Sequence, residues 1–268
     1  MKQWLHTARA FPTMLKVGFA DAVAYRAEFL VWVLAYTMPI IMLSLWTAVA
    51  REAPVGRFDE QGFRAYFMAT LVIRLLSGSW VVWEMNMEVR QGTLQKRLLR
   101  PVHPLLSYLA ENLAAMPMRL IVATPIAVLC VLWLGLGSFS HDPWQLLLVP
   151  VAVLGAFLLS FSAMAAIGTL SLFWESSIAV FDLWLGLYTV FSGYVMPLEF
   201  FPPGIAELVR GLPFRSMLAF PVEALLGLMT LRACLFDLLL QWFWIACFSA
   251  LSYFLWKRGM RSFAAYGG

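Results

Sequence analysis

The stretch Glu84-Met-Asn-Met-Glu-Val-Arg-Gln-Gly92-Thr-Leu-Gln-Lys-Arg-Leu-Leu-Arg-Pro101 separates two long apolar runs. Gly92 predicts the end of the helix that leaves the first run, since glycine is a poor helix former. Thr93 can cap a new helix by accepting a hydrogen bond from a backbone N–H group. Leu94 and Leu98 are four residues apart, so they share one face of that helix. The stretch therefore predicts a short helix of one to two turns.

The end and the outer face of this short helix can also be predicted. Pro101 and Pro104 predict its end, because proline disfavours a helical conformation in the residue before it. The cations Lys96, Arg97 and Arg100 lie away from the leucine face. We expect the helix to lie parallel to a membrane on its cytoplasmic side, with a small leucine patch surrounded by positive charge. Such a patch suits docking into a groove of a soluble partner.

Composition places the flanking runs in a membrane. Hydrophobic residues make up 62% of the 268 residues and charged residues only 13%, whereas a typical soluble domain is about a quarter charged. The 12 Trp and 21 Phe agree, because amphipathic rings collect at membrane interfaces. A spanning helix needs about 20 mostly apolar residues. Six segments qualify, roughly residues 29–50, 65–83, 113–134, 144–173, 178–196 and 233–256.

Basic residues are distributed unevenly around these six predicted spans. They are frequent before the first span, after the second and after the last, and cytoplasmic loops of membrane proteins carry an excess of Lys and Arg. We therefore expect both termini to lie in the cytoplasm. The residues behind this expectation are Lys2, Arg9, Lys16, Arg26, Arg90, Lys96, Arg97, Arg100, Lys257, Arg258 and Arg261.

Two further segments are apolar without being able to span. Residues 1–27 carry an apolar stripe at helical spacing and predict an interfacial helix, bent or broken at Pro12. A soluble amphipathic helix is the alternative, and the charges in this segment argue against a cleavable signal peptide. Residues 197–228 are interrupted by prolines and glycines. Because irregular backbone at membrane depth must be buried in protein or line a cavity, they predict two short re-entrant helices, roughly 203–211 and 215–227.

Several charged residues fall within or near the apolar segments, where a charge is costly and faces the protein interior or a cavity. Arg74 lies in the middle of a predicted span. It is a candidate for a translocation path or a lipid-headgroup site, and a structural ion pair is an equal alternative. Glu199 and Arg215 are candidates for the same path, although a structural ion pair is favoured for Glu199, Arg215 and Glu223. Arg119 is expected to be structural.

The sequence carries no motif for ATP binding or catalysis. It lacks a GxxxxGK[ST] loop, a HExxH pair and a GxSxG elbow. Asp182 and Asp237 could form an intramembrane pair, but their flanking residues match no intramembrane enzyme family. The cysteines form no CxxC pair, so neither a metal site nor a disulfide framework is indicated, and no nucleic-acid interface is expected. An intramembrane enzyme and a non-transporting scaffold are the alternatives to a transport subunit.

These segments resemble the permeases of type-2 ABC transporters. The resemblance is carried by a glutamate followed by Gly-Thr-Leu at 92–94 and Leu-Leu-Arg-Pro at 98–101, between the second and third predicted spans. The run Ser-Gly-Tyr-Val-Met-Pro-Leu-Glu at 192–199, with Pro-Pro at 202–203 and Leu-Pro-Phe at 212–214, looks like the same family's segment before the last span. The chain is especially similar to a bacterial subgroup, over essentially its whole length.

The resemblance implies the type-2 ABC exporter fold, an all-α permease domain over residues 1–268 with a coupling region at 84–108. It implies a bacterial inner membrane, a dimer with an identical or homologous permease, and ABC ATPase subunits that bind ATP and Mg. This chain is expected to bind no cofactor itself, and its substrate is not encoded. Family members often have an acidic residue where Gln95 stands, so a more basic docking surface than usual is expected. The residues expected to dock the ATPase are Gly92, Thr93, Leu94, Lys96, Arg97, Leu98, Leu99, Arg100 and Pro101.

Overall fold

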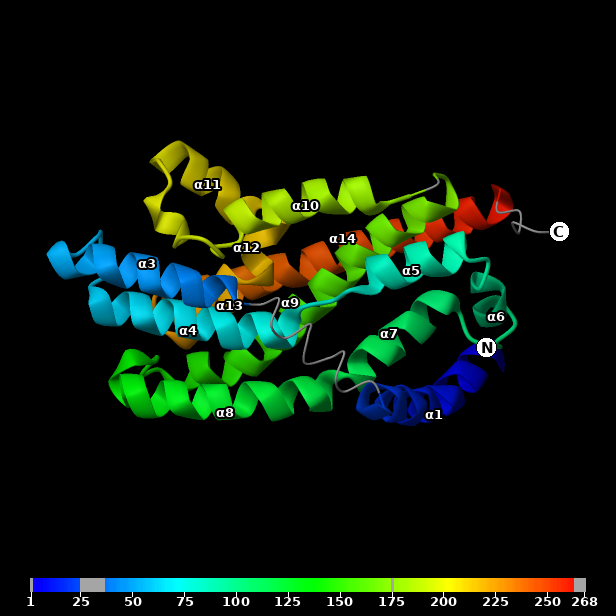
Figure 1. The fold of residues 1–268 in the computed structure, drawn as a ribbon, viewed down its shortest axis with the longest axis horizontal. Coiled ribbons are helices and arrows are strands. Elements are labelled where there is room, and N and C mark those ends of the chain that lie inside the picture. Colours follow the sequence, from blue (N-terminus) through cyan, green and yellow to red (C-terminus); the bar gives the residue numbers. More distant parts are fainter. Residues whose placement is uncertain (1, 25–36, 175, 263–268) are drawn as a thin grey trace.

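The computed structural model describes residues 2–24, 37–174 and 176–262, and these form an elongated bundle of helices (Figure 1). The long helices run along one axis. The start of α1 (Lys2–Ala24), the short α6 (Leu94–Leu98) and the last turns of α14 (Leu231–Ser262) lie at one end. The helix α11 (Pro203–Gly211) lies toward the opposite end. These are called the α6 end and the α11 end below.

Four helical segments are long and apolar enough to cross a membrane. They cover Glu60–Arg90, Pro104–Leu134, Pro143–Leu172 and Leu231–Arg261. Within them the helices are α4 (Glu60–Ser77), α5 (Val81–Arg90), α7 (Pro104–Ala114), α8 (Met116–Leu134), α9 (Pro143–Thr169) with the 3-10 turn η2 (Leu170–Leu172), and α14. They coincide with the second, third, fourth and sixth predicted spans.

The two remaining predicted spans correspond to shorter helices. α10 (Ile178–Phe191) is apolar but falls below the length of a spanning helix. The first predicted span, residues 29–50, lies partly outside the described residues, and its second half forms α3 (Met38–Glu52). The remaining described elements are the short 3-10 turns η1 (Leu136–Ser138) and η3 (Leu198–Phe200) and the short helices α12 (Pro213–Met217) and α13 (Ala219–Leu225).

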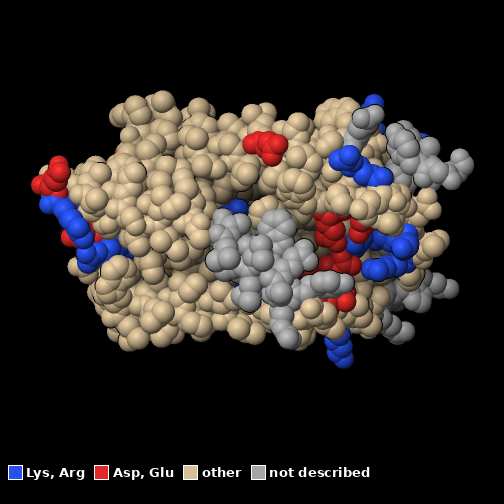
Figure 2. Space-filling model, in the orientation of Figure 1, with Lys and Arg blue, Asp and Glu red and all other residues tan. Residues whose placement is uncertain are grey.

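Charge is distributed as expected for a membrane protein. Lys, Arg, Asp and Glu gather near the two ends of the molecule, and a broad band between them is almost free of charge (Figure 2). Large apolar side chains are exposed along that band, among them Leu132, Leu147 and Leu239. A band of exposed apolar side chains is unusual on a soluble monomer and agrees with the presence of helical segments long enough to cross a membrane.

The helix α9 is the centre of the bundle, where it packs against α14, α4, α5 and α13. Small residues permit the close approach. A side-chain carbon added at Gly155 would collide with Gln241 of α14, and one added at Gly168 would collide with Met85 of α5. Close packing through small residues is the usual means by which helices associate in a membrane, where lipid tails are as apolar as the side chains.

The break between α4 and α5 explains one of the predicted structural charges. The chain is not helical at Gly78, so that its carbonyl oxygen is available as an acceptor. Arg119 of α8 donates a hydrogen bond from Nη1 to that oxygen and lies 5.7 Å from the ring of Phe157. A freed backbone acceptor inside a bundle needs such a partner, so the structural interpretation of Arg119 agrees with the contact.

The segment before the last span folds back into the bundle. α11 has the predicted bounds, whereas the second predicted helix is divided into α12 and α13 by Leu218, whose backbone is not helical. Residues 213–222 are all buried. The entry to this segment is Gly193, with φ of +84°, and its carbonyl oxygen accepts a hydrogen bond of 2.9 Å from Tyr66. An added side-chain carbon there would meet Tyr66 and Ala219.

The N-terminal helix α1 packs along α7. Gly18 provides the close contact, since an added side-chain carbon would lie 2.9 Å from Ala114. The expectation that Pro12 might break this helix is wrong, because α1 continues through it. Its position at a membrane interface stays a prediction.

Candidate functional site

The turn before α6 depends on glycine but not on the predicted threonine cap. Gly92 has φ of +68°, in the left-handed region that favours glycine. Thr93 occupies the cap position but makes no side-chain cap hydrogen bond. Its backbone is helical, so Oγ1 turns back toward the carbonyl oxygen of Glu88, at 3.5 Å. The predicted capping role of Thr93 is therefore wrong.

The leucines of α6 are divided between the interior and the surface. Leu94 is fully buried, whereas Leu98 is 36% exposed and Leu99 is 87% exposed. The expectation of one exposed Leu94–Leu98 face is wrong for Leu94, because α6 lies against the helices that flank it and turns its first leucine inward. The exposed apolar patch is Leu98 with Leu99.

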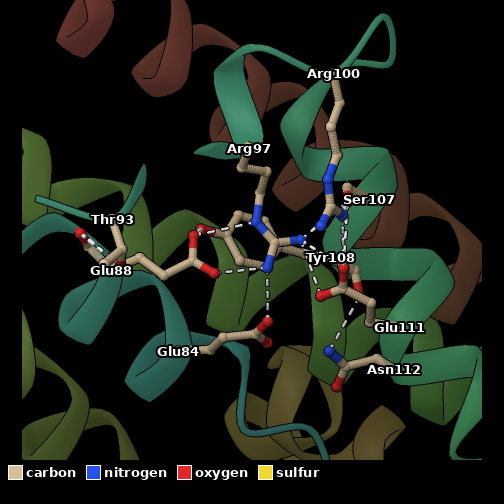
Figure 3. A network of polar contacts seen from close by, with 9 residues as sticks. All are labelled: Glu84, Glu88, Thr93, Arg97, Arg100, Ser107, Tyr108, Glu111 and Asn112. Carbon is tan, nitrogen blue, oxygen red and sulfur yellow. Dashed lines mark hydrogen bonds and ion pairs between the residues drawn. The ribbon is translucent and has the colours of Figure 1, made fainter. Parts of the chain in front are cut away.

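Arg97 is the centre of the site, and its side chain is only 8% exposed (Figure 3). Its guanidinium donates to Glu88 at 2.6 and 3.1 Å and to Glu84 at 2.9 Å, both on α5. It also donates to both carboxylate oxygens of Glu111 on α7, at 2.8 and 2.9 Å. A planar guanidinium with several fixed donors suits such a shared arrangement. Arg97 was expected on the docking surface, and the structure places it beneath that surface.

Three further side chains complete the network. Tyr108 lies under the Arg97 guanidinium, 3.8 Å from the ring centre, and its hydroxyl donates to Glu88 at 2.6 Å. Ser107 accepts from Arg97 at 2.9 Å. Arg100, on the exposed side, reaches Glu111 at 3.3 Å. The cluster therefore satisfies its buried charges with hydrogen bonds from several directions, as buried charges require.

The electrostatics keep Arg97 charged. Burial alone would lower the pKa of Arg97, but the hydrogen bond to Glu88 and the charges of Glu111 and Glu84 outweigh it and raise that pKa. Arg97 thus remains a cation at any physiological pH. It ties α6 to both α5 and α7, and each of these helices continues directly into a membrane-length segment.

His103 does more than occupy a turn. Its Nδ1 accepts a hydrogen bond of 3.3 Å from the backbone N–H of Leu105, at the start of α7. Its ring centre lies 5.7 Å from that of Tyr253 and 6.0 Å from that of Trp256, both on α14. Burial lowers the pKa of His103. Its place directly before Pro104, the first residue of α7, fits this capping position.

An apolar groove opens beside this region. It has a volume of about 780 Å³ and lies between α7, α9 and α14. Arg100 and His103 contribute to its lining together with Leu105, Phe161 and Ser252. Its size is in the range of sites that hold small molecules, and its apolar walls suit an acyl chain.

The predicted path residues do not form one cluster. Arg215 of α12 binds Glu223 of α13 and Asp237 of α14, both at 2.7 Å. Glu199 pairs with Arg57 at 2.6 Å. Glu199, Arg215 and Glu223 each lie in an ion pair, as the structural interpretation expected. Both contacts tie the segment before the last span to its neighbours.

Arg74 lies against aromatic rings. Its guanidinium carbon is 4.9 Å from the ring centre of Tyr188 and 6.0 Å from that of Tyr194. The adjoining cavity, lined by Arg74, Trp184 and Tyr188 among others, has a volume of about 30 Å³. A space of this size holds about one water molecule. That volume is far below the roughly 300–1,000 Å³ of small-molecule sites.

No metal site is found in the part of the chain that the structure describes, because no three His, Cys, Asp or Glu side chains gather suitably. Cys130 and Cys234 are buried free thiols. The three glutamates that do gather share the Arg97 guanidinium.

One comparison with known proteins identifies the family of the chain. The sequence profile described as ABC-2 family transporter protein matches residues 22–267. The chain belongs to the ABC-2 transporter family. The resemblance inferred from residues 92–101 is thereby confirmed. This ABC-2 protein is a multi-pass membrane protein and a permease subunit of an ABC transporter, a class that works with an ATPase partner. No curated protein sequence matches the chain.

Sequence reasoning missed most of the ABC-2 permease's Arg97 network. Glu84, Glu88 and Glu111 were not named as its partners, nor were Tyr108 and Ser107. One signal for these partners was present in the sequence. Residues 89–110 contain no Asp or Glu, so the nearest acids to the basic run are Glu88 before it and Glu111 after it. Glu84 and Glu88 are also four residues apart, which places them on one face of a helix.

Proposed function

We propose that this ABC-2 permease forms an exporter whose separate ATPase docks on the exposed part of residues 92–101. The proposal rests on the difference between the two sides of α6. Leu98 and Leu99 are exposed on one side, and Arg97 on the other side binds α5 and α7. A partner that pushes on α6 therefore pushes on two helices that each belong to a membrane-length segment.

The docking residues divide into two groups. Lys96, Leu98, Leu99, Arg100 and Pro101 are exposed and would touch the ATPase. The others act from within: Gly92 and Thr93 shape the turn, and Leu94 and Arg97 fasten α6 to the bundle. ATP and Mg would bind on the ATPase.

We assign the α6 end to the cytoplasm of a bacterial cell and the protein to its inner membrane. Exposed cations at this end support the assignment, among them Lys96, Arg100, Lys257 and Arg258. α3 and α10 would complete six spans, and α11 to α13 would form the re-entrant segment. α1 would lie in the membrane interface, and a second permease, identical or homologous, would complete a dimer. Lipid acyl chains would enter the groove beside α7.

The three candidate path residues differ in whether an ion pair holds them in place. Arg215 and Glu199 are committed to ion pairs that brace the re-entrant segment. Arg74 faces a cavity between α4, α9 and α10, so of these three it is the one we retain for the path, which would open in another conformation. Export rather than import follows from the family resemblance.

The test is Leu99→Asp, with Leu136→Asp as the matched control. Leu136 is 77% exposed but lies after α8, away from α6. We expect Leu99→Asp to insert normally and to lose the ATPase on co-purification, because a charge in an apolar docking pocket lacks a partner. The control should keep the ATPase. Normal co-purification with Leu99→Asp would contradict the docking assignment.

A further inference from the structure

The segment that carries Leu98 and Leu99 holds basic residues and no acidic ones. Residues 89–110 contain no acidic residue. The nearest acids along the chain are Glu88 and Glu111, and both turn inward onto Arg97, as does Glu84 (Figure 3). The buried arginine thus draws the three carboxylates of this region away from the outer face of α6.

The cations of the same segment remain outside. Lys96 is exposed, and the side chain of Arg100 is 53% exposed even though it reaches Glu111. Figure 2 shows the consequence, with acidic side chains over α5 and basic ones further out, over α6. The outer surface is an apolar patch, Leu98 and Leu99, with a basic rim.

We infer that the ATPase presents an apolar pocket with an acidic rim to this surface. The inference rests on the proposed function and adds the chemistry of the partner. A leucine that is 87% exposed needs an apolar counterpart, and rim charges of opposite sign accelerate association and exclude partners of like charge. Because the charged side chains of residues 89–110 are all cations, charge complementarity favours carboxylates on the ATPase.

Anionic lipid headgroups are the competing partner for exposed cations. The placement of α6 favours a protein. α6 lies beyond the end of α5, at the extreme of the bundle's long axis (Figure 1). A soluble partner can reach Leu98 and Leu99 there, because both side chains are exposed. A nanodisc of zwitterionic phosphatidylcholine removes the lipid contribution from the experiment.

The experiment measures the association rate between the permease in such nanodiscs and the ATPase that co-purifies with the tagged wild-type chain. The test variant is Lys96→Glu, because Lys96 is exposed and its side chain takes part in no described hydrogen bond or ion pair. Arg100→Glu is the second variant. Arg232→Glu, an equal charge change at an exposed position at the start of α14, is the control.

We expect Lys96→Glu to slow association about tenfold at about 0.1 M salt, since rim charges act chiefly on the association rate. At about 1 M salt, where the Debye length is about 3 Å, the difference should fall below about twofold. Arg100→Glu should behave likewise, and Arg232→Glu should associate as the wild type does.

Three results would overturn the inference: no slowing in either variant, faster association, or equal slowing in Arg232→Glu. If Leu99→Asp abolishes association while Lys96→Glu and Arg100→Glu leave the rate unchanged, the ATPase docks at α6 but lacks an acidic rim. If Leu99→Asp also binds normally, the docking assignment itself fails.

Discussion

Two buried arginines hold the two irregular parts of this permease, and they do so differently. Arg215 binds two carboxylates whose side chains are 15% and 12% exposed, inside the bundle. Arg97 binds three carboxylates that are 20% to 35% exposed, at the edge of the bundle. The first cluster is nearly dry, and water reaches the second. The buried Arg215 cluster holds its helices in one arrangement. The Arg97 cluster can tolerate movement of its helices, because water can solvate its glutamates when their contacts change.

The largest expected effect is that of Arg215→Leu. It leaves Glu223 and Asp237 buried without their cation, and breaking a buried ion pair from one side costs about 3–5 kcal/mol. We expect a matching loss in thermal unfolding of the purified protein. Arg57→Leu, which removes a half-exposed ion pair with Glu199, is the control and should cost less than about 1 kcal/mol. A stable Arg215→Leu protein would remove the distinction between the two clusters.

Arg97→Leu should destabilise less, by about 1–3 kcal/mol, because water can solvate the partly exposed glutamates that it releases. Its main effect should be on coupling. The exposed leucines remain, so the ATPase should still co-purify, but its hydrolysis should no longer drive movement of α5 relative to α7. Distances between spin labels on these helices, with and without ATP, provide the measurement. Arg97→Lys is the partner variant, since a lysine lacks the planar fork.

A larger loss of stability in Arg97→Leu than in Arg215→Leu would reverse the comparison. So would an Arg97→Leu protein in which ATP moves α5 and α7 as in the wild type.

The smallest expected effect is a pH dependence at the α6 end. Burial lowers the pKa of His103 in the folded protein, so the unfolded chain binds the proton more readily. The stabilisation by the neutral ring is therefore complete above the unfolded pKa of about 6.5 and is lost as pH falls through the lower folded value. It amounts to no more than about 1 kcal/mol, the value of a helix cap.

His103→Asn tests this, because asparagine caps a helix without titrating near neutral pH. The wild type should lose more thermal stability than the variant on acidification. Parallel losses in both proteins would assign the effect to another group.

Local composition was sufficient for the main elements of the permease. Apolar length predicted the segments at 65–83, 113–134, 144–173 and 233–256, and helices of membrane length cover them. Prolines and glycines predicted that residues 197–228 do not span, and the structure divides them into short helices. Gly92 marked the turn before α6. These features depend on neighbours in the chain, which the sequence displays directly.

By itself the sequence determined that this protein is a helical membrane permease with a short basic helix between two spans. Only the tertiary structure decided which side of that helix is buried. Leu94 and Arg97 turn inward because α5 and α7 meet beside α6 and bring Glu84, Glu88 and Glu111 together. The pairing of Arg215 with Asp237 likewise joins residues far apart in the chain. A buried charge selects its partners by distance in space, and hydropathy along the chain does not contain that distance.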